Sequence, residues 1–228
     1  MTSSYRENYT ILLGFARAKN YELKVQIAGW EQGDERELSF LGMTIRTTTF
    51  GVELEGDEKH VKKLEEEWGM DTCNPVATPY VKPTGSFNRP VENDEPKAMS
   101  QAEATQYRRA AARINYVSLD RPDLSFATRV ASSHMSNPRE GDEHVVKRSI
   151  RYMKGKPRVA TRYEFQEDRN TLTVFTDSDW AGYEKSRRST SRGVVCRGSH
   201  TINWWCAIQA NIALSFCEAE LDAALKGQ

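Results

Sequence analysis

Prolines divide this chain more sharply than any other sequence feature. Five of the eight prolines lie between residues 71 and 99, at positions 75, 79, 83, 90 and 96. Each of them removes a backbone donor and biases the preceding residue away from a helix. The stretch NRPVENDEPK (88–97) also offers almost no apolar side chain for burial. We therefore expect residues 71–99 to form a Pro-rich linker, extended or mobile, at a domain boundary.

The N-terminal side of this linker shows one hairpin and one helix. Two short runs rich in apolar residues, 38–46 and 50–55, are joined by three threonines and predict a β-hairpin. Asp57 is suited to cap a following helix that ends near Gly69. Val61, Leu64 and Trp68 recur at helical spacing in this stretch and would form its buried face.

Three helices are predicted after the linker, over residues 100–164. The first begins with Ser100 and Glu103, which have the spacing of a capping box. The second begins at Asp120, with Pro122 in its first turn, and ends before Pro138. The third covers about 142–154. We expect these helices to form a three-helix connection region.

The last part of the chain changes to strand periodicity. Residues 171–177 alternate between apolar and polar side chains, and residues 192–197 and 200–205 have the composition of two further strands. Residues 217–226 are strong helix formers. The predicted fold class is therefore α+β, with a three-stranded sheet and one helix at the end of the chain.

The net charge is zero, but the charges are unevenly distributed. Residues 31–100 carry 15 acidic and 8 basic side chains, whereas residues 101–164 carry 7 acidic and 13 basic ones. Four of these basic side chains lie on the predicted helix within 142–158: Lys147, Arg148, Arg151 and Lys154. They could bind a nucleic-acid backbone, or they could form an ordinary solvated helix face.

Cysteine spacing and hydropathy limit the remaining classes. The four cysteines form no CxxC pair, and the N-terminus lacks the pattern of a secretory signal, which predicts an intracellular protein, cytoplasmic or nuclear, with free thiols. A zinc site from Cys196, His200, Cys206 and Cys217 is the alternative, although its spacing matches no common ligand pattern. No apolar run approaches the roughly 18 residues of a membrane span, so we expect no membrane partner.

Two acidic residues carry the main chemical hypothesis. Asp177 ends a predicted strand and Glu220 lies in the predicted final helix. Carboxylates brought together in this way are hard oxygen ligands for Mg²⁺, and several of them are needed for two-metal phosphodiester hydrolysis. The opposing interpretation is that Asp177 and Glu220 have no catalytic role, because two carboxylates at such positions are easily found in a chain with 32 acidic residues.

Several motifs follow one another along the chain in a recognisable order. The C-terminal ones are FTDSDWAG (175–182), RRSTS (187–191), INWW (202–205) followed by Gln209, and ALSFCEAEL (213–221). Five further motifs lie upstream: FLGMTI (40–45), WGMDTCNPVATP (68–79), QYRRAAARINYVSLDRPDLSFA (106–127), SSHMSNP (132–138) and VKRSIRYMKG (146–155). These upstream motifs are similar to the region that joins reverse transcriptase to its ribonuclease H. In their order and spacing, these motifs resemble the Pol polyproteins of copia-type LTR retrotransposons, and the resemblance covers about residues 38–225.

The resemblance implies an organisation and an activity. Residues 1–70 would be a remnant of the C-terminal region of reverse transcriptase, 100–164 the helical connection region, and 165–228 a truncated ribonuclease H-like domain. The family hydrolyses the RNA strand of RNA–DNA hybrids with Mg²⁺ or Mn²⁺. Asp177 and Glu220 align with its first two catalytic, metal-binding carboxylates. The implied partners are an RNA–DNA hybrid and the rest of a Pol polyprotein.

Departures from the family pattern predict an incomplete enzyme. The later carboxylates of the family lie beyond the point where this chain ends, and no polymerase Asp-Asp signature precedes FLG. Arg192 also stands where the family has glycine, which would cost roughly 1–2 kcal/mol if that position required positive φ. We therefore expect little or no catalysis. The alternative function is a non-catalytic nucleic-acid-binding module that uses the basic helix.

Overall fold

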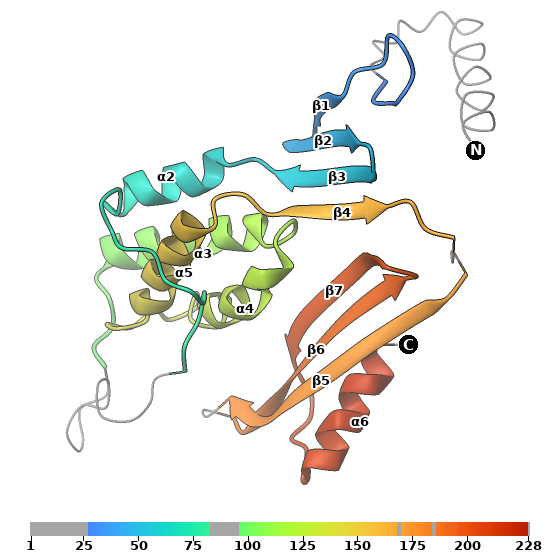
Figure 1. Cartoon of the computed structure of the whole chain (residues 1–228). Helices are drawn as coiled ribbons and strands as arrows, with labels where there is room; N and C mark the ends of the chain where they lie inside the picture. Colours follow the sequence, from blue (N-terminus) through green and yellow to red (C-terminus); the bar gives the residue numbers. More distant parts are fainter. Residues whose placement is uncertain (1–26, 83–95, 168–169, 184–185, 228) are drawn as a thin grey trace, which may run out of the picture.

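The chain folds into an α+β structure with two antiparallel sheets and five helices in the residues described. The structure is a computed structural model that describes residues 27–82, 96–167, 170–183 and 186–227. The first sheet has the strand order β1-β2-β3-β4, and the second has the order β5-β6-β7. Figure 1 shows a group of helices beside the first sheet and one helix, α6, against the second. The α+β class predicted from the sequence is confirmed.

The predicted N-terminal hairpin contains three strands. The run 38–46 is interrupted by a two-residue turn, Leu41 and Gly42, where φ is +50° and +80°. Positive φ at both positions is typical of the tight turns that join antiparallel strands. The strands are therefore β1 (Glu37–Phe40), β2 (Met43–Thr48) and β3 (Gly51–Gly56). The prediction missed the turn because Leu41 is not a usual turn residue.

The fourth strand of this sheet comes from the far side of the helical region. β4 (Ala160–Glu164) pairs antiparallel with β3, and Leu54 lies opposite Thr161. This pairing joins residues from both sides of the Pro-rich segment in one sheet. Periodicity within a short window does not reveal such a pairing, because the partner strand is about 100 residues away in the sequence.

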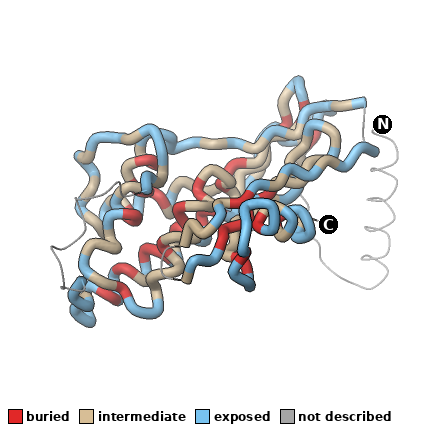
Figure 2. The backbone as a smooth tube through the Cα atoms, turned by 90° about the horizontal axis from the view of Figure 1, so that it is seen from below, coloured by how far each residue is buried: buried red, intermediate tan, exposed pale blue. Residues whose placement is uncertain are grey.

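Four helices form the main hydrophobic core. They are α2 (Lys59–Glu67), α3 (Gln101–Val117), α4 (Ser125–Ser133, preceded by a 3₁₀ turn at Pro122–Leu124) and α5 (Glu143–Gly155). The capping box predicted at the start of α3 is present. Figure 2 colours the buried residues red. The core holds mainly aliphatic and alanine side chains, including Leu64, Ala111, Ile114, Val146 and Ile150.

The described part of the Pro-rich segment, up to residue 82, is held against α5. It forms neither helix nor strand, and the N–H of Val76 donates to the carbonyl of Arg151 at 3.4 Å. Val76 and Tyr80 also pack against the helical core. This part of the segment therefore lies on the helical surface. Residues 83–95 of the predicted linker lie outside the described residues.

The second sheet is a simple meander followed by a helix, in the order predicted. β5 (Leu172–Tyr183) pairs with β6 (Arg188–Arg197), which pairs with β7 (His200–Ile208). β5 and β6 extend further toward their shared turn than the alternation predicted. α6 (Phe216–Lys226) packs on β5 and β6 and buries Ala219 and Ala223. None of the helices in the described ranges is long and apolar enough to cross a membrane.

Candidate functional site

Asp177 lies in the middle of β5, and its carboxylate forms an ion pair with an arginine. Its cross-strand partner in β6 is Arg192, whose Nη2 donates to Asp177 Oδ2 at 2.6 Å. The Arg192 guanidinium also lies over the Phe126 ring of α4, 5.6 Å from its centroid. The Asp177 side chain is 60% exposed. Asp177 therefore sits on the face of the sheet that looks toward α4.

Glu220 lies on the other face of the same strand. Its Oε1 accepts hydrogen bonds from the Ser178 hydroxyl at 2.8 Å and from the Ser178 backbone N–H at 3.3 Å. Ser178 is buried beneath α6. Because successive side chains of a strand point to opposite faces, Asp177 points away from α6 where Ser178 points toward it.

The structure therefore does not bring the two predicted catalytic carboxylates together. The prediction did not take into account which face of β5 each side chain occupies. Asp177 is in the row of side chains that faces α4, whereas Ser178, which binds Glu220, is in the row that faces α6. Among the residues described, no group of three or more His, Cys, Asp or Glu side chains is placed to hold a metal ion. The donor set thus does not fit the Mg²⁺ or Mn²⁺ that the resemblance implies, and it does not fit the alternative zinc site. All four cysteines are free thiols.

Arg192 carries no backbone strain at the position where the family has glycine. It lies within β6, between Asp177 of β5 and Cys206 of β7 in the sheet register. The non-glycine residues with positive φ in the described parts of the chain are Leu41, Ala181 and Arg187. The conditional strain at residue 192 therefore does not arise. Its effect is electrostatic, because the guanidinium neutralises Asp177.

A buried glutamine also holds α6 on the sheet. Gln209 follows β7, and its Nε2 donates to Ser191 Oγ at 2.9 Å and to the carbonyl of Ala219 at 2.8 Å. At the edge of this contact, Trp180 Nε1 donates to the carbonyl of Ala213 at 3.2 Å. Sequence reasoning placed Gln209 in a motif without giving it a structural role.

The four predicted phosphate-binding side chains on α5 have mainly internal partners. Arg151 Nε donates to the carbonyl of Asn74 at 2.7 Å, and Arg148 Nη2 donates to Thr78 Oγ1 at 2.9 Å. Lys154 donates to the carbonyl of Asp71. Lys147, which is 51% exposed, lies 3.7 Å from Glu143. Three of these cations therefore fasten the described part of the Pro-rich segment to α5.

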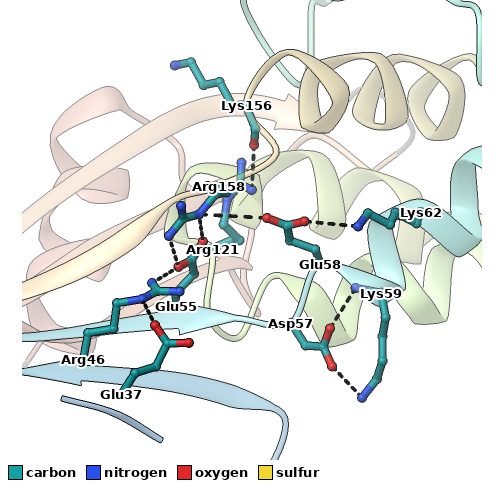
Figure 3. Close-up of polar contacts among 10 residues, drawn as sticks. All are labelled: Glu37, Arg46, Glu55, Asp57, Glu58, Lys59, Lys62, Arg121, Lys156 and Arg158. Atoms are coloured by element: carbon teal, nitrogen blue, oxygen red, sulfur yellow. Dashed lines mark hydrogen bonds and ion pairs between the residues drawn. The ribbon is translucent and has the colours of Figure 1, made fainter. Parts of the chain in front are cut away.

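An ion-pair network that sequence reasoning missed joins the first sheet to the helices (Figure 3). At its centre, the nearly buried Glu55 of β3 accepts from Arg158 at 2.6 and 2.7 Å and also pairs with Arg46 of β2. The Arg158 hydrogen bonds, with help from Arg46, lower the pKa of the Glu55 carboxyl to about 2. The network borders an open pocket of about 700 Å³.

The partners around Glu55 explain why the network was not visible in the sequence. Arg158 lies 103 residues away, in the connection between α5 and β4. Beside the network, Arg121 Nη1 donates to the carbonyl of Lys156 at 3.1 Å, which fixes the same connection (Figure 3). The network orders the junction between β3, α2 and β4. The charges of Arg46, Glu55 and Arg158 pair with one another, so we assign the network a structural role.

Comparison with known proteins places the chain among retrotransposon sequences. It is 29% identical to an uncharacterized mitochondrial protein of Arabidopsis thaliana, over 81% of this chain and 72% of that protein. It is 30% identical to the retrovirus-related Pol polyproteins from the Arabidopsis thaliana transposons RE1 and RE2, over 82% and 79% of this chain. No protein-family model and no solved structure matches.

The alignments also show how small a part of the polyproteins is matched. The aligned region makes up only 12% of each of the two Pol polyproteins. It nevertheless extends over most of this chain, as the ordered motifs predicted. The chain is therefore homologous to one segment of the retrovirus-related Pol polyproteins of copia-type transposons.

Proposed function

We propose that the chain is a non-hydrolytic segment of a retrotransposon Pol polyprotein, with a connection region at residues 100–164 and a ribonuclease H-like unit at 165–228. The order of three antiparallel strands followed by a helix supports the second assignment, together with the motifs on β5, β6 and α6. The packing of α3, α4 and α5 around a common core supports treating the connection region as one helical body.

The observation that carries the lack of hydrolysis is the opposite orientation of Asp177 and Glu220. Two-metal hydrolysis needs carboxylates around ions about 3.5–4 Å apart. Here the Asp177 carboxylate holds a guanidinium at 2.6 Å, and Glu220 accepts hydrogen bonds from Ser178 on the other face. A divalent cation beside Asp177 would have to displace Arg192 and would still lack Glu220.

A cleavage assay tests this proposal. A fluorescent RNA–DNA hybrid is incubated with the chain and Mg²⁺ or Mn²⁺, and we expect no turnover above background. The Arg192→Gly variant frees the Asp177 carboxylate, yet it should remain inactive because Glu220 stays bonded to Ser178 on the other face of β5. Metal-dependent turnover by the parent chain that disappears in Asp177→Asn would overturn the proposal.

Binding of an RNA–DNA hybrid by residues 142–158 is a second candidate, favoured by the excess of basic side chains in 101–164. The number of side chains available for phosphate contacts is smaller than predicted, because three of the four donate hydrogen bonds to the Pro-rich segment. We expect weak binding without sequence preference, with a log–log salt slope near −1 rather than the roughly −3.6 of four contacts.

A salt titration of hybrid binding, measured by fluorescence anisotropy, tests this second candidate. Lys147→Glu should remove most of the salt dependence, whereas the matched variant Lys62→Glu on α2 should not. Both lysines are exposed and lie near a glutamate one helical turn away. A steep slope that both variants leave unchanged would place the binding surface elsewhere.

A further inference from the structure

Residues 70–80, which we call the strap, lie across the basic side chains of α5. The strap forms neither helix nor strand. The hydrogen bond from the Val76 N–H to the Arg151 carbonyl, 3.4 Å long, joins its backbone to that of α5. Further hydrogen bonds come from the side chains of α5. The strap therefore lacks the ladder of backbone bonds that would fix a strand in place.

Three cations of α5 donate to uncharged groups of the strap. Arg148 binds a threonine hydroxyl, and Arg151 and Lys154 bind backbone carbonyls. These acceptors carry no formal charge, so the bonds leave the three positive charges in place. A phosphate oxygen would add the attraction between opposite charges to the same hydrogen bonds. The strap therefore holds these side chains with weaker acceptors than a nucleic-acid backbone offers.

The strap also leaves one buried donor of α5 unsatisfied. Arg148 Nη2 donates to Thr78 Oγ1 at 2.9 Å, whereas Arg148 Nε is buried with no hydrogen-bond partner among the described residues. A buried donor without a partner costs free energy. A guanidinium commonly binds a phosphate through two parallel N–H···O bonds, so a phosphate in place of the strap could satisfy both nitrogens.

Apolar packing, rather than charge, keeps the strap in place. Val76 and Tyr80 pack against the helical core, and the Tyr80 ring lies 5.1 Å from the Phe126 ring of α4. Pro75 comes so close to α5 that a Cβ on Gly155 would lie 2.9 Å from its own Cβ. Phosphates and the strap would thus compete for the same cations, with apolar contacts favouring the strap.

We propose that the strap is an autoinhibitory cover of a phosphate-binding face on α5. In the closed state it occupies Arg148, Arg151 and Lys154 and leaves Lys147 exposed. When the strap is displaced, all four side chains can contact the backbone of an RNA–DNA hybrid. This inference rests on the second candidate function, hybrid binding by residues 142–158, and adds the regulation of that site.

A pair of valine substitutions tests the strap through the salt dependence of hybrid binding, measured by fluorescence anisotropy. Between 50 and 200 mM salt, one phosphate contact loses about threefold in affinity and four contacts lose about 150-fold. We expect the parent chain near the first value and Val76→Ser well toward the second, because Val76→Ser weakens the packing of the strap. Val81→Ser is the matched control, since Val81 is 48% exposed and lies beyond the strap. Equal salt dependence of the two variants would overturn the proposal.

Hydrogen exchange shows whether the strap opens, without any nucleic acid. The amide at position 76 should exchange faster in Val76→Ser than in the parent chain, whereas the amide of Ile150 in the core of α5 should not change. An open strap with the salt dependence of the parent chain would contradict the proposal. So would a steep salt dependence with the amide at position 76 still protected.

A milder substitution tests the strap without disturbing its packing. Thr78→Val removes the hydroxyl that binds Arg148 and makes one further cation available. The affinity loss between 50 and 200 mM salt should rise to about twelvefold. Thr78→Ser keeps the hydroxyl and should behave as the parent chain does. Equal salt dependence of these two variants would show that the strap does not restrain Arg148, against the proposal.

The strap and the candidate function fail in different ways. Parent binding that Lys147→Glu abolishes, together with no difference between Val76→Ser and Val81→Ser, overturns the strap and retains the candidate function. Steep binding by Val76→Ser and none by the parent chain supports the strap and limits hybrid binding to the open state. The absence of binding by every variant and by the parent chain overturns both.

Discussion

The helical region and the C-terminal sheet bury side chains of very different kinds. The core around α2–α5 contains large aliphatic and aromatic side chains, including fully buried Tyr107, Leu64 and Ile114. Under α6, the buried residues are alanines, serines and Gln209, a set that includes Ala219, Ala223, Ser178 and Ser191. Burial of apolar area is the main favourable term in folding. The helical region therefore supplies most of the stability, and the sheet depends on specific hydrogen bonds.

A pair of leucine substitutions should give the largest contrast between the regions. Leu64→Ala on α2 removes a fully buried side chain and should lower the free energy of unfolding by about 3 kcal/mol. Leu221→Ala on α6 removes one that is 60% exposed and should change it by no more than about 0.5 kcal/mol. Urea denaturation measures both. Equal losses would mean that the C-terminal region has a core as dense as the helical one.

The next effect is a pH dependence at the junction of the first sheet. Glu55 has its pKa lowered from 4.5 to about 2, so its ion pairs stabilise the fold above about pH 4.5, and this contribution is lost as the pH falls toward 2. Glu55→Gln should cost about 2 kcal/mol at pH 7, because it removes charge-assisted hydrogen bonds, and it should flatten the acid limb of the stability curve.

The matched control for this junction is Glu53→Gln on the same strand. Glu53 pairs with Arg162, whose side chain is 69% exposed, so its loss should cost less than about 0.5 kcal/mol. Unfolding measured between pH 2 and pH 7 compares the two variants. If the acid limb of Glu55→Gln runs parallel to that of the parent chain, Glu55 does not carry the pH dependence.

A smaller effect is expected for the hydrogen bonds beneath α6. Gln209→Ala removes the donor to Ser191 and to the Ala219 carbonyl and should cost about 1 kcal/mol. Hydrogen exchange should quicken in α6 and β7 and not in α3. Exchange that accelerates equally in both regions would show that they unfold as one unit.

The smallest effect is expected at Asp177. Its ion pair with Arg192 is exposed, so Asp177→Asn should change the free energy of unfolding by no more than about 0.5 kcal/mol. Thermal denaturation in low and high salt measures this. A loss above about 2 kcal/mol would mean that the carboxylate has buried partners that the exposed pair does not account for.

Local patterns predicted the elements well, and they failed where partners are distant. Spacing within a few residues identified the capping box at Ser100, the buried face of α2 and the meander of β5–β7. The addition of β4 to β3 and the link from Arg158 to Glu55 join residues about 100 positions apart. Periodicity in a local window carries no information about such pairings.

The roles predicted for the candidate site residues stay predictions, and the sequence did not reveal how these residues are arranged. The motifs located Asp177 and Glu220 on the correct elements, but the face of a strand depends on its register against the helix. On α5, nucleic-acid binding by Lys147, Arg148, Arg151 and Lys154 likewise stays a prediction. The sequence did not reveal the hydrogen-bond partners of these basic side chains, because the Pro-rich segment that supplies them was expected to be a linker.

Paramagnetic relaxation by Mn²⁺, observed by NMR, tests the central claim that Asp177 and Glu220 lie on opposite faces of β5 and share no metal ion. The account predicts no saturable, site-specific broadening of the signals of both residues at low Mn²⁺ concentration. Joint broadening of residues 177 and 220 with one titration midpoint, abolished by Asp177→Asn, would contradict it.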